Sequence, residues 1–365
     1  MVAVAGGRRP VLLVDDEGAI LAALRRNLHA HFDVHLCDNA DDALAALGRV
    51  PFSALISDMQ MPGMSGAELL ARARMVAPDT TRMLLTGHSD LAMAIQAIDD
   101  GQLFRFLNKP CGLDTLRRHL DAAIARYDRI GGDDPLLRAV ARDRHRIDGS
   151  GAAAVHYQPI VSLADGRTAG VEATMTVTAG DTDGALRRWM LCAACDEVAS
   201  WPLEQLTLTV KLSGNVDTAT LRGDIDTALA FSALPASRLT ISFAQNTFDD
   251  AGRIADLAAM LHAHGVSIGL DNVTLHTYNA LPRTHLDTVK FAPSVVAALT
   301  NNGDVPAAWR AFIQDRREGG TVFAADGVER DGQREACTRE GFAAAQGSLW
   351  APALVPHRLL EALAS

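Results

Sequence analysis

The stretch Ala54-Leu-Ile-Ser-Asp58-Met-Gln-Met-Pro62-Gly63 predicts a buried strand, an acidic residue at its end and then a Pro-Gly turn. A short apolar run that turn residues close is typical of a strand. In an open parallel α/β sheet, ligands bind at the carboxyl ends of the strands, and Asp58 falls at such an end. We therefore treat Asp58 as the residue around which the first part of the chain is organised.

Three other apolar runs in this region also end in polar residues that could share one site. Asp15 and Asp16 follow residues 11–14, Thr86 follows residues 83–85, and Lys109 follows residues 104–107. Clustered carboxylates provide the oxygen ligands that Mg²⁺ prefers. The metal can hold a phosphoryl group against a carboxylate nucleophile, while a lysine and a hydroxyl contact the phosphoryl oxygens. The pattern therefore indicates phosphoryl chemistry at one edge of a sheet.

In this order, the five polar positions resemble those of a response-regulator receiver domain, and the resemblance covers residues 10–126. It implies a flavodoxin-like, doubly wound α/β domain in which Asp58 accepts a phosphoryl group from a sensor histidine kinase. It also implies that Asp16 and Asp58 bind Mg²⁺, with Asp15 helping through a water molecule. The remaining roles that it implies are phosphoryl sensing by Thr86 and Lys109 and switching by the aromatic Phe106.

The composition fits a globular protein of two domains. The chain has 365 residues, of which 48% are hydrophobic and 21% charged, and its formal net charge is −10; domains usually have roughly 100–200 residues. A surface that binds nucleic acid would usually be basic. No apolar run reaches the ~18 residues that span a bilayer, and residues 1–10 lack the apolar core of a signal peptide. We expect a cytoplasmic protein without DNA binding or membrane insertion.

The five cysteines do not indicate a disulfide framework, because their number is odd and they are scattered along the chain. Cys192 and Cys195 form a CxxC pair within residues 186–199, which have a helical pattern. No second pair or histidine follows at the spacing of a zinc site. We interpret the two residues as small side chains of a helix.

A change in composition separates the first domain from a second one. We expect a tail at residues 1–9, the receiver at 10–126, a linker with a helix at 135–147 within 127–151, and a second domain at 152–365. Strand-like and helical segments alternate through the second domain, which predicts a closed (β/α) barrel of the TIM type. The usual dimerisation surface of receivers corresponds to residues 89–98, 104–107 and 113–124, so we expect a homodimer.

The second domain resembles an EAL domain, a family that hydrolyses cyclic di-GMP with two Mg²⁺ or Mn²⁺ ions. The motifs that carry this resemblance are His156-Tyr-Gln-Pro-Ile-Val161, Gly170-Val-Glu172-Ala173, Leu270-Asp271-Asn272, Val289-Lys290-Phe291, Ala325-Asp326-Gly-Val-Glu329 and Gln346-Gly347. The retained site positions that it implies are Glu172, Asp271, Lys290, Glu329 and Gln346. Gln158 and Pro352 match positions that line the nucleotide pocket of the family.

Several metal-ligand positions of the family are replaced in this chain. Lys211 stands in place of an asparagine, Ser242 and Asp326 in place of glutamates, and Asn272 in place of an aspartate. Two-metal hydrolysis needs carboxylates that hold the ions ~3.5–4 Å apart, whereas an ammonium repels a cation. We therefore interpret the barrel as a degenerate EAL domain whose retained residues form a buried ion-pair network. We also hypothesise that Lys211 pairs with Glu172 or Asp271 in place of the metal.

Three functions remain open on the sequence alone. The favoured one is a response regulator in cyclic di-GMP-related signalling, in which phosphorylation of Asp58 controls a catalytically inactive barrel that contacts an unknown downstream protein. In the second, the barrel binds cyclic di-GMP without hydrolysing it, although the arginine expected shortly after Thr174 is absent and a bidentate phosphate clamp is hard to replace. In the third, the barrel is a phosphorylation-gated phosphodiesterase with a rearranged metal site.

Overall fold

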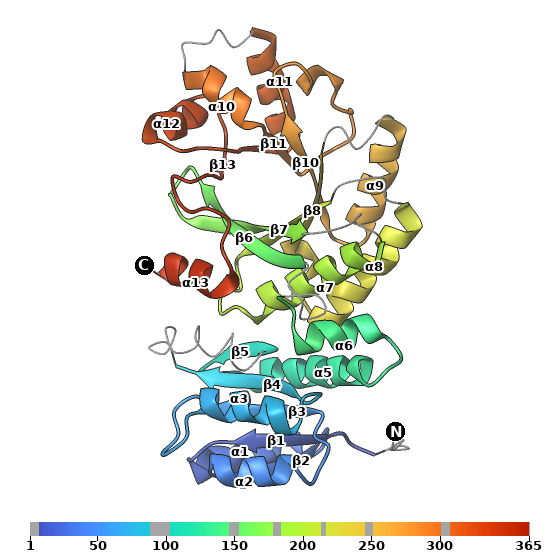
Figure 1. The fold of residues 1–365 in the computed structure, drawn as a ribbon, viewed down its shortest axis with the longest axis vertical. Helices are drawn as coiled ribbons and strands as arrows, with labels where there is room; N and C mark the ends of the chain where they lie inside the picture. Colours follow the sequence, from blue (N-terminus) through green and yellow to red (C-terminus); the bar gives the residue numbers. More distant parts are fainter. Residues whose placement is uncertain are drawn as a thin grey trace.

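The computed structural model consists of an open sheet with its helices, followed by a closed barrel (Figure 1). It describes residues 7–87, 103–145, 153–177, 184–212, 217–244, 251–300 and 307–364. The predicted fold, a doubly wound α/β domain followed by a TIM-like barrel, is confirmed. Within the described ranges, no helix is both long and apolar enough to cross a membrane.

The first domain is a parallel sheet with the strand order β2-β1-β3-β4-β5. In β1, Val11 and Leu13 belong to one apolar cluster and Leu12 and Val14 to another. Successive side chains of a strand point to opposite faces, so a sheet that is apolar on both faces needs helices on both. Helices α1 and α5 cover the first face, and α2 and α3 cover the second.

The elements of this domain are β1 (Pro10–Val14), α1 (Gly18–Leu28), β2 (Asp33–Cys37), α2 (Ala40–Leu47), β3 (Ala54–Asp58), α3 (Gly66–Val76), β4 (Thr81–Thr86), β5 (Arg105–Asn108) and α5 (Leu113–Ile130). The helix predicted at residues 89–98 lies outside the described residues. Because all five strands are parallel, their carboxyl ends lie along one edge of the sheet, where the predicted phosphoryl site would be.

The second domain is a closed barrel with the strand order β10-β11-β12-β13-β6-β7-β8-β9. Strand β6 runs antiparallel to both of its neighbours, β7 and β13, and the other pairs are parallel. Gln158 on β6 lies opposite Glu172 on β7. The parallel strands bring their carboxyl ends to one mouth, as in other barrels of this kind.

The strands of the barrel are β6 (Ala153–Ser162), β7 (Thr168–Val177), β8 (Thr207–Leu212), β9 (Leu239–Ala244), β10 (Ser267–Val273), β11 (Thr288–Phe291), β12 (Val322–Ala325) and β13 (Ala344–Ala345). Its helices are α7 (Gly184–Ser200), α8 (Thr218–Ser232), η1 (Ala236–Arg238), α9 (Ala251–Ala263), η3 (Tyr278–Ala280), α10 (Pro293–Thr300), α11 (Ala307–Glu318), α12 (Asp331–Arg339) and α13 (Pro356–Ala364).

The two domains are joined by a short helix and by a shared apolar core. Helix α6 (Pro135–Arg142) begins after Asp134, whose carboxylate accepts the backbone N–H of Leu136 (3.0 Å). The predicted linker helix therefore exists, but it ends earlier than residue 147, and residues 146–151 lie outside the described part. One continuous cluster of buried side chains extends from the sheet through α6 into the barrel.

Candidate functional site

Asp58 is the last residue of β3, at the point where the strand ends and the turn to α3 begins. Its side chain is largely buried, and Asp15 beside it is only 2% exposed. Ser65 caps α3 by accepting the backbone N–H of Glu68 (3.2 Å), which fixes where the turn ends. Oxygens of Asp15, Asp16 and Asp58 lie within 4.8 Å of one another. This donor set fits Mg²⁺, which binds oxygen ligands.

Lys109 brings a positive charge to the same edge. Its Nζ lies 2.5 Å from Asp58 Oδ1 and 3.4 Å from Asp15 Oδ2. Burial lowers the pKa of Lys109, but the hydrogen bond to Asp58 and the charges of both carboxylates outweigh this and raise the pKa. The side chain therefore stays protonated, and it is placed to contact an anionic group bound to Asp58.

Thr86 and Phe106 lie on the strands beyond β3. Thr86 is the last residue of β4, is buried, and donates its hydroxyl hydrogen to Gly87 O (2.9 Å). In the pairing of β4 with β5, Thr86 lies opposite Asn108 and Leu84 opposite Phe106. The candidate sensing residues are therefore carried by β4, which pairs with β3, and by β5, the edge strand of the sheet.

Lys290 on β11 is the centre of a buried ion-pair network in the barrel. Its Nζ lies 2.6 Å from Glu172 Oε2 and 3.5 Å from Asp271 Oδ1. The three residues are 5%, 4% and 1% exposed, respectively. Burial lowers the pKa of Lys290, but the charges of Glu172 and Asp271 outweigh it and raise the pKa. Two carboxylates that match metal-ligand positions of the EAL family by resemblance thus share one ammonium group.

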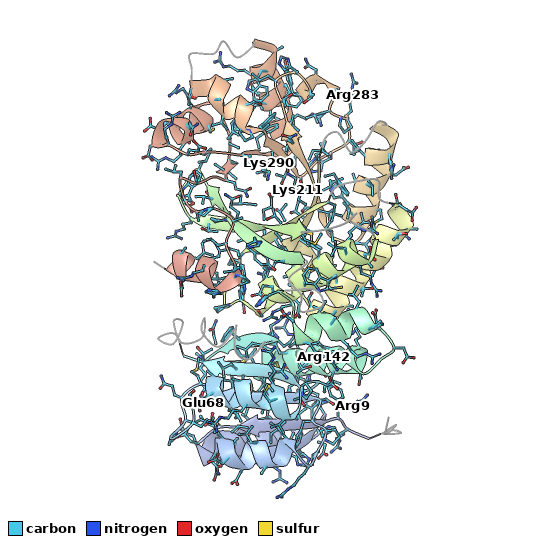
Figure 2. All side chains as sticks on the ribbon, viewed as in Figure 1. Arg9, Glu68, Arg142, Lys211, Arg283 and Lys290 are labelled. Atoms are coloured by element: carbon cyan, nitrogen blue, oxygen red, sulfur yellow. The ribbon has the colours of Figure 1, made fainter. Side chains whose placement is uncertain are left out.

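Lys211 on β8 contacts the second oxygen of Asp271, Oδ2. Lys211 and Lys290, both labelled in Figure 2, contact the same carboxylate, Asp271. Burial raises the pKa of Asp271, but the charge of Lys290 and the hydrogen bond from Lys211 outweigh it and lower the pKa. Of the two partners expected for Lys211, the structure gives Asp271.

Two glutamines extend the network toward the end of the chain. Lys290 Nζ donates to Gln346 Oε1 (3.2 Å), and Gln346 Nε2 donates to Gln158 Oε1 (2.7 Å). Gln158 Nε2 in turn donates to Ala351 O (3.0 Å). This chain of hydrogen bonds occupies both glutamine side chains, and Pro352, which follows Ala351, is exposed.

Two of the remaining predicted positions do not join the network. Glu329 was expected to belong to it, but its side chain is exposed, because it lies in the loop between β12 and α12, where its backbone N–H donates to Gln333 Oε1 (2.7 Å). Asn272 is also exposed and has φ 61°, a left-handed conformation that asparagine tolerates better than most residues.

Two other replaced positions do lie near the network. Ser242 is 5% exposed and pairs with Lys211 across β8 and β9. The charge of Asp326 contributes to raising the pKa of Lys290. Glu172 and Asp271 are therefore paired with lysines, the side chains of Ser242 and Asn272 are neutral, and Asp326 and Glu329 keep their carboxylates.

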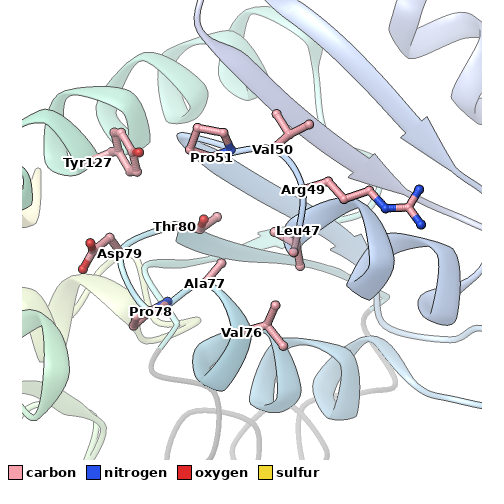
Figure 3. A pocket seen from close by; sticks show the side chains of 11 residues that line it. Leu47, Arg49, Val50, Pro51, Val76, Ala77, Pro78, Asp79, Thr80 and Tyr127 are labelled. Atoms are coloured by element: carbon pink, nitrogen blue, oxygen red, sulfur yellow. The ribbon is translucent and has the colours of Figure 1, made fainter. Parts of the chain in front are cut away.

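A separate cavity of about 320 Å³ lies in the first domain, at the end of the sheet opposite Asp58 (Figure 3). It is bounded by the loop before β3, the loop before β4, and Tyr127 of α5. Residues 47–51 and 76–80 supply the other side chains that line it. Because this cavity lies at the other end of the strands from Asp15, Asp16 and Asp58, it is not part of the predicted phosphoryl site.

A second cluster of buried charges was not predicted from the sequence. Asp196 and Glu197 on α7 are both 0% exposed, although α7 is otherwise apolar from Trp189 to Ala199. Arg126 of α5 and Arg144 contact these two acids. Acidic residues inside a long apolar run are a signal of buried ion pairs, and that signal was present in the sequence.

The fold and the two sites define a receiver domain joined to a barrel of the EAL type. Residues 11–121 match the response regulator receiver domain family, and residues 144–353 match the EAL domain family. The second match covers more than half of the chain. The protein belongs to the EAL domain family and carries a response regulator receiver domain before the barrel.

The curated relatives share the receiver segment. The chain is 34% identical over 116 residues to the hydrogenase transcriptional regulatory protein HoxA of Cupriavidus necator, covering 31% of this chain and 24% of that protein. It is 39% identical over 107 residues to the C4-dicarboxylate transport transcriptional regulatory protein DctD of Rhizobium meliloti, covering 29% and 23%. The chain thus spans about a quarter of the length of these relatives.

Solved structures support the fold of the barrel. The EAL domain of Xanthomonas citri FimX in complex with c-diGMP is similar, with a TM-score of 0.50 and 18% identity, covering 64% of this chain and 97% of that one. The EAL enzyme Bd1971 in its cAMP and cyclic-di-GMP bound form has a TM-score of 0.51 and 15% identity, covering 69% and 76%. At this identity the likeness concerns the fold alone.

Proposed function

We propose that the protein is a cytoplasmic two-component response regulator whose EAL-type barrel is catalytically inactive. A sensor histidine kinase would phosphorylate Asp58, with Asp15 and Asp16 helping to hold the Mg²⁺ that neutralises charge during the transfer. Lys109 would contact the phosphoryl oxygens, and Thr86 and Phe106 would respond to them. The barrel would then act in cyclic di-GMP-related signalling by contact with a downstream protein.

The pairing of Lys211 and Lys290 with the retained carboxylates is the observation that carries this proposal. Glu172 and Asp271 each contact an ammonium group, and Asp271 contacts two. An ammonium offers no lone pair to a metal, and its positive charge opposes a cation nearby. Metal-assisted hydrolysis needs carboxylates that are free to bind the ions, and Glu172 and Asp271 are instead engaged by lysines, so we derive no catalytic step in the barrel.

A homodimer of the phosphorylated protein is part of the proposal. The receiver surface expected to pair includes residues 104–107 and 113–124, and α5 of that surface packs against α8 of the same chain. A second copy could use this surface only after the barrel moves away. Analytical ultracentrifugation with and without beryllofluoride, a mimic of phosphorylated Asp58, tests this; equal masses in both states would contradict a phosphorylation-dependent dimer.

The receiver half is tested by phosphoryl uptake. The wild-type protein should become labelled by radioactive acetyl phosphate in the presence of Mg²⁺, and Asp58→Asn should abolish the labelling because the amide cannot form the acyl phosphate. Asp38→Asn, a change at an exposed acid of the same domain, serves as the control and should leave uptake unchanged. Equal labelling of Asp58→Asn and wild type would refute the assignment of the phosphoacceptor.

The barrel half is tested by titrating the purified protein with cyclic di-GMP in Mn²⁺ and separating the products by chromatography, with and without beryllofluoride. An inactive interaction module should give neither bound nucleotide nor linear product. Binding without product would instead make the barrel a sensor of cyclic di-GMP. Product, in either state, would show a working phosphodiesterase and overturn the proposal.

A double substitution asks whether the lysines are the reason for inactivity. Lys211→Asn with Ser242→Glu removes one ammonium and adds one carboxylate beside Asp271. Mn²⁺ affinity, measured by calorimetry, should increase about tenfold or more, because the metal no longer competes with Lys211 for the carboxylate. Lys211→Gln alone is the control, since it removes the charge without adding a ligand. No gain would place the deeper defect in residues 271–277.

A further inference from the structure

The receiver and the barrel meet at the second buried charge cluster. Asp196 of α7 accepts two hydrogen bonds from Arg126 of α5, one from Nη1 to Oδ1 and one from Nη2 to Oδ2 at 3.1 Å. Arg144, which follows α6, donates Nη1 to the same Asp196 Oδ2 (3.0 Å) and also to Leu103 O of the receiver (3.0 Å). One barrel carboxylate therefore binds an arginine from the receiver and one from the connecting segment.

Glu197, the next residue of α7, holds the other side of Arg144. Arg144 Nε lies 2.7 Å from Glu197 Oε2, and His145 Nε2 lies 2.8 Å from the same oxygen. Trp201 Nε1 donates to Glu197 Oε1 (2.8 Å). Both oxygens of each acid are thus used, and the arginines that they bind are nearly buried, at 6% for Arg126 and 2% for Arg144.

Aromatic and backbone groups of the barrel complete this binding surface. The Arg126 guanidinium lies 4.0 Å from the centre of the Phe231 ring of α8, a favourable cation–π distance. Arg105 of β5 donates Nη2 to Ser232 O, the last residue of α8 (2.5 Å). The α7–α8 surface is therefore built to hold arginine side chains.

Strand β5 connects this surface to the phosphoryl site. It carries Arg105, which contacts the barrel, and Phe106, which lines a cavity of about 490 Å³ between the domains. The residue after its last one, Asn108, is Lys109, which contacts Asp58. A change in how Lys109 meets Asp58 thus acts on the same four-residue strand that contacts the barrel.

We propose that Asp196 and Glu197 form a docking site on the barrel for the arginines of the protein's own receiver and connecting segment, and that phosphorylation of Asp58 releases it. The docked state covers α7 and α8 with the receiver. Release uncovers the carboxylates of Asp196 and Glu197 together with the aromatic rings of Phe231 and Trp201. These groups form a surface for a partner that presents arginine side chains. This inference deepens the proposed function, because it names how the receiver controls the barrel.

The physics of buried ion pairs makes such a site suited to a switch. Desolvation of the charges offsets much of their Coulombic attraction, so the docked and released arrangements can be close in free energy. When the domains separate and these ion pairs break, the arginines and the two carboxylates become exposed to water and are not left buried without a partner. A modest change in strand β5 can therefore shift the populations of two arrangements.

Hydrogen–deuterium exchange on the full chain tests this inference. In wild type, peptides covering residues 120–130 and 190–201 should exchange about tenfold faster with beryllofluoride and Mg²⁺ than without, because opening exposes their amides. Asp196→Asn should show the fast exchange without beryllofluoride. If Asp196→Asn does not fold, Arg105→Gln serves as the second variant. It removes the bond to Ser232 O but leaves both arginines on Asp196, so it should show the same faster exchange to a smaller degree.

The control is Arg238→Gln. Arg238 donates to Leu206 O (2.8 Å) and Leu203 O (3.1 Å), which are contacts within the barrel. Its loss should leave the beryllofluoride response of the peptides unchanged. A response reduced as strongly as in Asp196→Asn would indicate general loosening of the barrel and would overturn the docking site.

Fluorine NMR of bound beryllofluoride distinguishes a failure of the docking site from a failure of the proposed receiver function. Bound beryllofluoride with faster exchange at both peptides supports the docking site and its control by Asp58. Bound beryllofluoride with unchanged exchange overturns the inference and leaves the proposed receiver function standing. Absence of a bound signal would refute the receiver function itself, and the inference with it.

Discussion

At the scale of single residues, Lys290 decides the character of the barrel mouth. It lies between Glu172 and Asp271 and hydrogen-bonds Gln346. Two carboxylates this close repel each other unless a cation lies between them. Lys290, a position that the EAL family retains by resemblance, supplies a cation between these two carboxylates.

Replacing Lys290 should therefore destabilise the barrel. Lys290→Met leaves Glu172 and Asp271 buried, with only Lys211 as a cation, and should lower the free energy of unfolding by roughly 3–5 kcal/mol. Urea unfolding followed by circular dichroism measures this. The double variant Lys290→Met with Glu172→Gln should recover part of the loss, because one uncompensated charge is removed; an equal or larger loss would mean that packing, not charge, dominates.

The sequence predicted the residue-scale sites unevenly, for physical reasons. Asp58, Lys109 and the pairing of Lys211 were accessible because strand ends of a parallel sheet or barrel are forced to one edge. Glu329 was not, because it lies in a loop, whose side-chain direction no periodicity determines. The contact of Arg126 with Asp196 joins residues far apart in the chain, and a charged side chain on a helix usually faces water.

At the scale of elements, the start of α3 is fixed by the absence of a side chain. A Cβ on Gly66 would lie 1.9 Å from Asp58 O and 2.9 Å from Leu84 Cδ1. The backbone of α3 therefore passes directly against the end of β3. At Gly18, the first residue of α1, an added Cβ would have no other atom within 4 Å.

This contrast gives a matched pair of substitutions. Gly66→Ala should destabilise the receiver by about 2–3 kcal/mol through overpacking and should slow phosphoryl uptake at Asp58, because the strand end must shift. Gly18→Ala should be neutral or stabilise by a few tenths of a kcal/mol, since alanine favours a helix. Thermal unfolding and acetyl phosphate labelling measure both. Equal effects at the two positions would show that the close contact is not restrictive.

Helix α7 should make stability depend on pH through Glu197. Burial raises the pKa of Glu197, but the charges of Arg144 and His145 outweigh it and lower the pKa to about 2. Its ordinary pKa is ~4.3, so the carboxylate stabilises the folded state fully above about pH 4.3 and progressively less as the pH falls toward 2.

Comparison with Glu197→Gln isolates this contribution. Near pH 5, where Glu197 is ionised, the wild type should be more stable than the variant by on the order of 3 kcal/mol. The difference should shrink as the pH decreases from about 4.5, because the wild-type side chain loses its charge. Urea unfolding at a series of pH values from neutral to 3 measures it. A difference that does not change over this range would contradict the role of the Glu197 charge.

At the scale of the whole molecule, the receiver and the barrel share one apolar cluster and one buried charge cluster. The order of the two domains could be predicted, because a change in composition separates two series of alternating strands and helices. How they pack could not, because it depends on contacts of α5 with α7 and α8, which lie far from α5 in the sequence. Domains that bury charges and apolar groups between them should unfold together rather than separately.

Differential scanning calorimetry of the unphosphorylated protein should therefore show one transition for the two domains. Arg126→Met should separate it into two transitions, because the receiver loses its bond to Asp196 while both domain cores remain intact, and should lower the stability by about 3 kcal/mol.

Arg358→Gln is the control: its pair with Glu361 is exposed, at 65% and 57%, and such pairs contribute under ~1 kcal/mol. Two transitions in the wild type would show that the two shared clusters do not couple the domains, whereas one unchanged transition in Arg126→Met would assign the coupling to the apolar cluster around α6.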